Sequence, residues 1–320
     1  MPSDAAPAPA PAASPLPRAT ALRRALAILG DPWTMLILKE AYNGQRRFSG
    51  FRKALNIPRQ TLSLRLAALC RDQMLWRRPV SADHATLEYA LTAKARDLDQ
   101  AMYAVWLWHE ANPGPVDALP FDIVHRDCGQ VLGATFRCRS CGGAVHSGSV
   151  TIQPTEPVQF DTEPRPRLSR RNDGAFAAAG PGGPETTLAA SLVGDIPCNE
   201  ILWLLFRSPT RLLAIAEGLG LGVPVVRDRL DRLIQLGLVA EERQGRMVVF
   251  SVLPRAEGFF PLLLAINAWG DRWCNGTQPP PEQVVHDCGA LLDGRYVCDH
   301  CGGAVKPGQV SIRPRGEPAA

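Results

Sequence analysis

The sequence lacks an uninterrupted apolar run long enough to cross a membrane. Its longest apolar run, residues 259–269, is broken by Pro261 and Asn267 and falls short of the roughly 20 residues that a membrane-spanning helix needs. The first 17 residues are rich in Ala and Pro and have neither the basic region nor the apolar segment of a secretory signal peptide. These absences predict a cytoplasmic protein with a disordered leader over residues 1–17.

Motifs that support catalysis are also missing. The sequence has no phosphate-cradling glycine-rich motif, no nucleophile elbow and no pair of carboxylates placed to act together, so we expect a protein that is not an enzyme. The net charge of +4 is too small to indicate a nucleic-acid partner by itself. Its 320 residues, 46% of them hydrophobic, are enough for two ordinary domains.

A duplication is the strongest positive signal. Residues 127–145 and 287–305 are identical at 10 of 19 positions, at a constant offset of 160. Fainter matches continue upstream at an offset of 164, and near the later tryptophans the offset is 161. The second copy has therefore lost about three residues, in a segment that we predict to be a hairpin tip, where changes of length are tolerated best. The upstream matches include Gly30 with Gly194, Asp31 with Asp195 and Arg65 with Arg229.

The first copy, residues 18–117, has the periodicity of four helices, a hairpin and a final helix. In the fourth helix, Leu62, Leu66 and Leu69 form one apolar stripe. Two strands, residues 75–80 and 87–91, follow it. This order predicts a winged helix-turn-helix whose fourth helix lies in a DNA major groove. The predicted fold class is mainly α with small β (α+β): two winged helix-turn-helix domains, residues 18–117 and 191–277, each followed by a short zinc-ribbon-like tail.

Several motifs of the first copy are similar to those of one bacterial family. They are Leu29-Gly-Asp-Pro-Trp-Thr-Met-Leu-Ile-Leu, Arg46-Arg-Phe-Ser-Gly-Phe-Arg, Ile57-Pro-Arg-Gln-Thr-Leu-Ser-Leu-Arg-Leu and Glu88-Tyr-Ala-Leu-Thr. Residues 18–112 thus resemble the HxlR family of winged-helix transcription regulators, which usually act as homodimers. The resemblance implies binding of DNA. It is looser over residues 190–276, where Ile196-Pro-Cys replaces the tryptophan motif. Some members sense oxidants through a cysteine that precedes the tryptophan; this chain has Thr20-Ala-Leu there, so we do not extend that role to it.

Charge distinguishes the two copies. Residues 18–117 hold 15 Lys and Arg against 9 Asp and Glu, whereas residues 190–276 hold 9 of each. Because Lys and Arg neutralise DNA phosphates, we expect the first copy to read DNA and the second to pair with it or to sense a ligand or partner. In the second recognition helix, Asp228 and Asp231 face away from the apolar stripe and would repel phosphates. The candidate DNA-binding residues, which could instead be a solvated helical face, are Arg46, Arg47, Arg59, Gln60, Ser63, Arg65, Arg77 and Arg78.

Each tail carries a Cys-x2-Cys-Gly motif that follows a histidine and a lone Cys-Gly. Three thiolates and one imidazole suit tetrahedral zinc, so we expect one zinc site in each tail, over residues 118–145 and 278–310. Asp287 or His300 remains an alternative fourth ligand in the second tail, and a metal-free turn or a labile disulfide remains an alternative to zinc. The expected ligands are His125, Cys128, Cys138 and Cys141 in the first tail, and His286, Cys288, Cys298 and Cys301 in the second.

These patterns together predict a sequence-specific transcriptional regulator that binds double-stranded DNA. A flexible linker, residues 146–190, rich in Pro, Gly, Ala and Arg, is expected between the copies. The copies could pair within one chain as a pseudo-dimer, through the first and last helices of each, or the chain could form a homodimer. A small-molecule effector could bind between helices. The alternative function is a protein–protein interaction module without specific DNA binding, which the salt dependence of DNA binding would distinguish.

Overall fold

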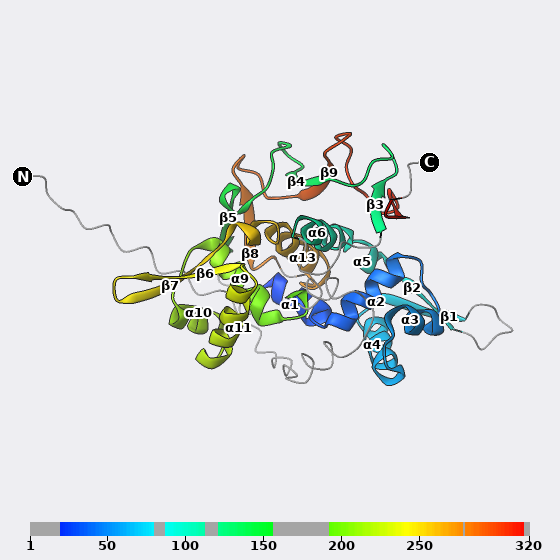
Figure 1. The fold of residues 1–320 in the computed structure, drawn as a ribbon, viewed down its shortest axis with the longest axis horizontal. Helices are drawn as coiled ribbons and strands as arrows, with labels where there is room; N and C mark the ends of the chain where they lie inside the picture. The colour runs from blue at the N-terminus through cyan, green and yellow to red at the C-terminus, as the bar shows by residue number, and fades with distance from the viewer. Residues whose placement is uncertain (1–19, 80–86, 113–120, 156–191, 278, 317–320) are drawn as a thin grey trace, which may run out of the picture.

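The computed structural model describes residues 20–79, 87–112, 121–155, 192–277 and 279–316 (Figure 1). The expected leader, the tip of the first hairpin and most of the expected linker lie outside these ranges. Among the helices in these ranges, none has the length and apolar character needed to span a bilayer.

The first half of the chain contains a helix-turn-helix followed by a hairpin. The turn forms because Asn56 ends α3 with a left-handed φ of 46° and Pro58 stands immediately before α4. Leu62, Leu66 and Leu69 of α4 are buried, as the stripe predicts. The elements of this half are α1 (Ala21–Leu29), α2 (Pro32–Tyr42), α3 (Phe48–Leu55), α4 (Arg59–Arg71), β1 (Leu75–Pro79), β2 (Leu87–Leu91), α5 (Ala93–Arg96) and α6 (Asp99–Ala111).

The second half repeats the order of elements from α2 onward. Gly220, with φ of 58°, ends the second helix of this half where Asn56 ends α3. Helices α4 and α11 lie on the same side of the molecule, one in each half (Figure 1). The elements are α9 (Ile196–Arg207), α10 (Leu212–Leu219), α11 (Val223–Gln235), β6 (Val239–Gln244), β7 (Met247–Val252), α12 (Pro254–Glu257) and α13 (Phe260–Trp273).

The two halves pack together through α1, α6 and α13, and their buried residues form one continuous core. The backbone N–H of Leu22 in α1 donates to Asn267 Oδ1 of α13 at 3.1 Å. Gly270 of α13 lies so close to α1 that a Cβ atom there would clash with the backbone oxygen of Ala21, which is why a glycine is needed. The ring of Trp108 in α6 meets that of Phe259 edge-on at 5.5 Å.

The contact between the halves is reciprocal. A Cβ atom on Gly30 would lie 2.7 Å from the side chain of Ile196, and one on Gly194 would lie 2.7 Å from the ring of Pro32. At the offset of 164, Gly194 is the counterpart of Gly30 and Ile196 is the counterpart of Pro32. Such an exchange of contacts is what a two-fold axis produces at the interface of a symmetric dimer. At this contact the two halves therefore meet in the reciprocal way that a two-fold axis gives.

The two tails exchange strands with each other. The first tail supplies β3 (Phe121–His125), β4 (Ala134–Cys138) and β5 (Val150–Pro154), and the second supplies β8 (Glu282–His286), β9 (Gly294–Cys298) and β10 (Val310–Pro314). Strand β3 pairs with β10, β4 with β9 and β5 with β8, each antiparallel, so every one of these pairs joins the two tails. In Figure 1 the tails form a layer on the side of the molecule opposite α4 and α11.

Two expected boundaries are wrong. Residues 147–154, assigned to the flexible linker, form a short 3₁₀ helix and strand β5. The second tail continues beyond residue 310 through β10. Both strands have their hydrogen-bonding partners in the other tail, more than 100 residues away, so local composition gave no sign of the pairing.

Candidate nucleic-acid interface and metal clusters

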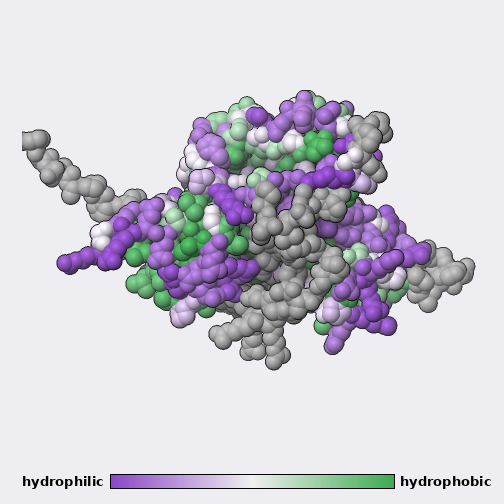
Figure 2. Space-filling model, in the orientation of Figure 1, coloured by the Kyte–Doolittle hydropathy of each residue, from purple (hydrophilic) through white to green (hydrophobic). Residues whose placement is uncertain are grey.

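The outer face of α4 is polar and carries no acidic residue. Arg59, Gln60 and Ser63 are exposed, and Leu64 beside them is 64% exposed. In Figure 2 the surface at the lower right, where α4 lies, is mostly hydrophilic. Leu64 is not among the candidate DNA-binding residues expected from the sequence. Its only signal there is that an apolar side chain occupies a position facing away from the buried stripe.

Four exposed arginines gather around the first hairpin. Arg47 forms an isolated antiparallel bridge with Glu88 of β2, and on the other side of β2 Arg78 of β1 is the partner of Glu88. Arg46 and Arg77 are their immediate neighbours, and all four arginine side chains are exposed. Arg47 Nε lies 3.9 Å from Glu88 Oε1, so the four arginines and this one carboxylate together have a positive net charge.

Arg65 is placed differently from the other expected DNA-binding residues. Its Nη2 lies 2.7 Å from Asp31 Oδ2, and Asp31 caps α2 by accepting from the backbone N–H of Thr34 at 3.1 Å. In the second half, Arg229 Nε lies 2.8 Å from Asp195 Oδ2. The structure therefore gives Arg65 a role inside the first half, and the matches at these positions in the repeat reflect a shared ion pair.

The arginines of α11 are neutralised by neighbouring carboxylates. Arg227 donates to Glu241 Oε2 at 2.9 Å and also to Asp231. The hydrogen bond to Glu241, and to a smaller extent that to Asp231, raises the pKa of Arg227 above its usual value. Arg232 lies 3.0 Å from Asp195, the carboxylate that also binds Arg229. Asp228 is exposed on the outer face of the helix. This face has no basic character comparable with that of α4.

The eight expected metal ligands lie in two clusters, and each cluster draws on both tails. Within each cluster the candidate ligand atoms lie within 4.8 Å of one another. The expectation of one site within each tail is therefore wrong, because the exchanged strands bring the histidine of one tail to the Cys-x2-Cys motif of the other. Neither cluster contains Asp287 or His300, the alternative ligands. The first cluster is His125, Cys128, Cys298 and Cys301, and the second is Cys138, Cys141, His286 and Cys288.

The dimensions of the first cluster fit a tetrahedral zinc ion. The sulfur atoms of Cys128 and Cys298 are 3.9 Å apart, and His125 Nδ1 lies 3.5 Å from Cys128 Sγ and 3.4 Å from Cys301 Sγ. Zinc bond lengths correspond to tetrahedral edges of about 3.8 Å between two sulfurs and about 3.6 Å between sulfur and nitrogen. In the second cluster, His286 Nδ1 lies 3.5 Å from Cys141 Sγ, in agreement with the first.

The surroundings favour the metal-binding thiolate of one cysteine in each cluster, Cys138 and Cys298. Burial alone would raise the pKa of Cys138, but hydrogen bonds from the backbone of Cys141 and Ser140 hold that pKa below its usual value, which favours the thiolate that binds metals. Among the described residues, the buried Nε2 of His125 has no hydrogen-bond partner, and Asp127 Oδ2 lies 3.9 Å from it. A carboxylate next to the second ring nitrogen is usual for a metal-binding histidine. All nine cysteines are free thiols.

Comparison with known proteins gives matches to one region of the chain. The sequence profile of the HxlR-like helix-turn-helix family matches residues 28–116. Rv3095 of Mycobacterium tuberculosis, named an uncharacterized HTH-type transcriptional regulator, is 37% identical over 131 residues, which are 41% of this chain and 83% of that protein. YdeP of Bacillus subtilis, with the same description, is 30% identical over 95 residues, 29% of this chain and 74% of that protein.

One matching solved structure is that of PA1607. The match covers 38% of this chain and 84% of the PA1607 chain, with 30% sequence identity and a TM-score of 0.35. The family resemblance expected for the first copy is confirmed by the profile and by the relatives. The chain belongs to the HxlR-like helix-turn-helix family of transcriptional regulators, and membership of this family implies that it binds DNA.

Proposed function

We propose that this chain is a sequence-specific DNA-binding transcriptional regulator in which α4 of the first half enters the major groove. The observation that carries the proposal is the exposed face of α4, with Arg59, Gln60 and Ser63 and no carboxylate. Arg and Gln side chains make paired hydrogen bonds to the edges of guanine and adenine, and an exposed apolar group such as Leu64 suits the methyl group of thymine.

The arginines around the first hairpin supply the contacts to phosphate. Arg46, Arg47, Arg77 and Arg78 are exposed and lie on adjacent backbone segments. Contacts of this kind position a protein on the duplex and carry little sequence information. They supply affinity in proportion to the counterions that they displace.

In this proposal the second half pairs with the first and does not read bases. Its recognition helix has arginines that are already bound to carboxylates, and it exposes Asp228. The pseudo-two-fold contact through Gly30 and Gly194 gives one chain the arrangement that related regulators reach by forming homodimers. A monomer would then recognise one half-site strongly, and the preferred DNA site would be asymmetric.

Zinc is the metal that we propose for both clusters. Three thiolates and one imidazole form a closed set of four ligands, which is typical of a structural site. When bound, zinc would connect the tail of one half to the tail of the other twice. His125 and Cys128 would hold the first ion together with Cys298 and Cys301, and no ligand position would be left for a substrate.

The test of DNA reading compares matched variants of the two recognition helices. A preferred sequence is first selected from a random DNA pool with the full chain, and dissociation constants are then measured on it. Arg59→Ala should weaken binding by about 1–3 kcal/mol and relax selectivity at one base pair. The matched controls, Asp228→Ala in α11 and Arg246→Ala in the second hairpin, should change affinity less than about twofold. If only the α11 variant lost affinity, DNA reading would belong to the second half, and the proposal would be wrong.

A further inference from the structure

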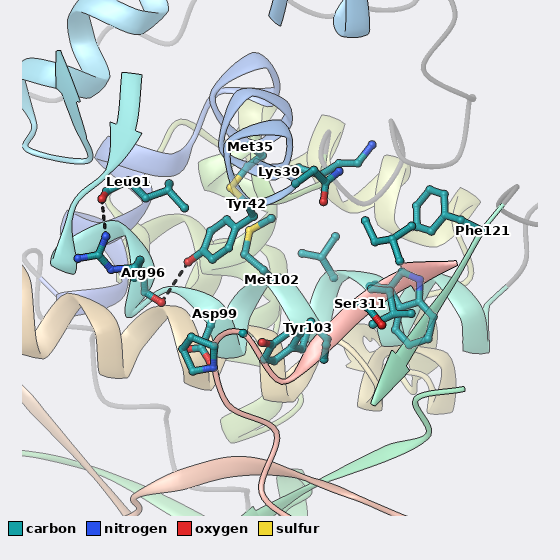
Figure 3. Close-up of a pocket in the computed structure, with 18 of the residues that line it drawn as sticks. Met35, Lys39, Tyr42, Leu91, Arg96, Asp99, Met102, Tyr103, Phe121 and Ser311 are labelled. Atoms are coloured by element: carbon teal, nitrogen blue, oxygen red, sulfur yellow. Dashed lines mark hydrogen bonds between the residues drawn. The ribbon is translucent and has the colours of Figure 1, made fainter. Parts of the chain in front are cut away.

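A cavity of about 570 Å³ lies between the first half and the tails (Figure 3). Its walls come from α2, α6 and the exchanged strand pair β3–β10. A volume of this size is in the range of sites that bind small molecules. Because β3 and β10 belong to different tails, both tails contribute to the wall of the cavity.

The interior of the cavity is aromatic and rich in methionine. The side chains of Met35, Tyr42 and Met102 lie together, and Tyr103 and Phe121 line other parts of the wall (Figure 3). Methionine sulfur and aromatic rings both make favourable contacts with flat aromatic surfaces. The shape and chemistry of this interior suit an aromatic ligand.

At the corresponding place in the second half, aromatic side chains contact one another. The ring of Phe260 stacks on that of Trp203 at 6.4 Å and lies 4.7 Å from that of Phe206. Trp203 also donates from its indole nitrogen to Glu282 Oε2 at 3.1 Å. Around the cavity, the first half therefore has polar residues at three positions where the second half has apolar aromatic rings in contact with one another. By the offsets of the repeat, Trp203 replaces Lys39, Phe206 replaces Tyr42, and Phe260 replaces Asp99.

The polar groups of the cavity indicate the charge of the ligand. Lys39, Arg96 and Arg126 line it, against the single carboxyl of Asp99, which accepts from the side-chain amide of Gln100 at 2.7 Å. Lys39 Nζ lies 6.0 Å from the centre of the Phe121 ring and 3.3 Å from Glu40. The excess of positive charge favours an anion.

A buried donor in the wall is left without a partner. Trp106 lines the cavity and is only 8% exposed. Within the part of the chain that the structure describes, its indole nitrogen has no hydrogen-bond acceptor. Buried N–H groups are rarely left unpaired. An acceptor supplied by a ligand would satisfy this one.

We propose that this cavity binds a flat aromatic molecule bearing a carboxylate, and that such a ligand is the effector of the regulator. The ring would lie among Met35, Tyr42 and Met102, and the carboxylate would meet the basic side chains. The effector role rests on the proposed DNA-binding function. The binding site does not depend on it. A ligand here would contact both α2, which precedes the helix-turn-helix, and the strand β3 that ends at His125 of the first cluster.

Titration calorimetry of the full zinc-loaded chain, without DNA, tests the site with three naphthalene probes. We expect 1-naphthoate to bind at least about tenfold more tightly than 1-naphthamide or 1-naphthylmethylamine. Lys39→Met and Trp106→Phe should each weaken the binding of naphthoate by about fivefold or more, and Met102→Trp, which places a bulky ring where the ring of the ligand would lie, should weaken it as well. Lys53→Met, a change at an exposed lysine of α3 outside the cavity, is the matched control and should leave binding unchanged.

Absence of naphthoate binding, or equal binding of the amine, overturns the proposed site. Parent-like binding of naphthoate by the Lys39 and Trp106 variants overturns the site as well. If the Met102 variant does not fold, these two variants alone decide the test. DNA affinity is then measured with and without saturating naphthoate, where an unchanged value overturns the effector role. Naphthoate binding by a chain that binds no DNA would contradict the proposed function and leave the site standing.

Discussion

Arg65 Nη2 lies 2.7 Å from Asp31 Oδ2 and thereby fixes the recognition helix α4 to the first turn of α2. The same pair recurs in the second half as Arg229 and Asp195. An arginine on a recognition helix thus has a structural role in both halves. If Arg59 reads DNA as we propose, stability and DNA reading depend on different arginines of α4, and the two roles are experimentally separable.

Replacement of Arg65 should reduce stability more than replacement of Arg59. Arg65→Met leaves the largely buried carboxylate of Asp31 without this partner, and because Arg65 itself is about one third exposed, solvent screening limits the loss to about 1 kcal/mol. Arg59→Met on the exposed face of the same helix should change the free energy of unfolding by less than about 0.5 kcal/mol. Chemical denaturation measures both, and equal losses would argue against a structural role for Arg65.

Replacement of a hairpin arginine should change the salt dependence of DNA binding. Arg78→Ala removes about one phosphate contact, so it should weaken binding to all sequences alike and reduce the slope of log K against log salt by about one. Affinities at several salt concentrations give the slope. Arg243→Ala, an exposed arginine of the second hairpin, is the control, and a slope that falls equally in this variant would contradict a basic surface confined to the first half.

Asp99 should make the protein relatively more stable as the pH falls. Burial raises the pKa of Asp99 to about 6, above its value in the unfolded chain. The folded state therefore binds more protons between these two pKa values, and the cost of the buried charge, which is complete above pH 6, decreases as the pH falls through 6.

Asp99→Asn removes this cost and should stabilise the protein by roughly 1–3 kcal/mol at pH 8, with a smaller gain at pH 6. Denaturation of both proteins at the two pH values gives the difference, and Asp97→Asn, a neighbour that is only partly buried, is the control. A gain that grows on acidification would show that the pKa of Asp99 is lowered by folding.

Local periodicity predicted much of the first half correctly. The buried stripe of α4 and the exposure of Arg59, Gln60 and Ser63 follow from one helical period, because both depend only on neighbours in the sequence. The role of Arg65 did not follow from periodicity. Its signal lay in the repeat, where Arg65 and Asp31 match a second Arg and Asp at the same offset.

The tails show where sequence reasoning stopped. Residue type and spacing identified all eight candidate ligands, since thiolate and imidazole chemistry is local. Their assignment to clusters depends on which strands pair, and a duplicated sequence fits pairing within a copy as well as exchange between copies. Phe136 pairs with Tyr296, its counterpart in the repeat. This register depends on how the two halves assemble, so the sequence of either half alone does not predict it.

Zinc content of paired cysteine variants tests the exchanged tails most directly. Cys128→Ser with Cys301→Ser alters one cluster only, whereas Cys128→Ser with Cys141→Ser alters two residues of the first tail that lie in different clusters. Mass spectrometry of the purified chains should give about two zinc ions in the parent protein, about one in the first variant and fewer than one in the second. One ion in the second variant and none in the first would show that each tail binds its own zinc, and would contradict a chain whose halves are joined by shared metal sites.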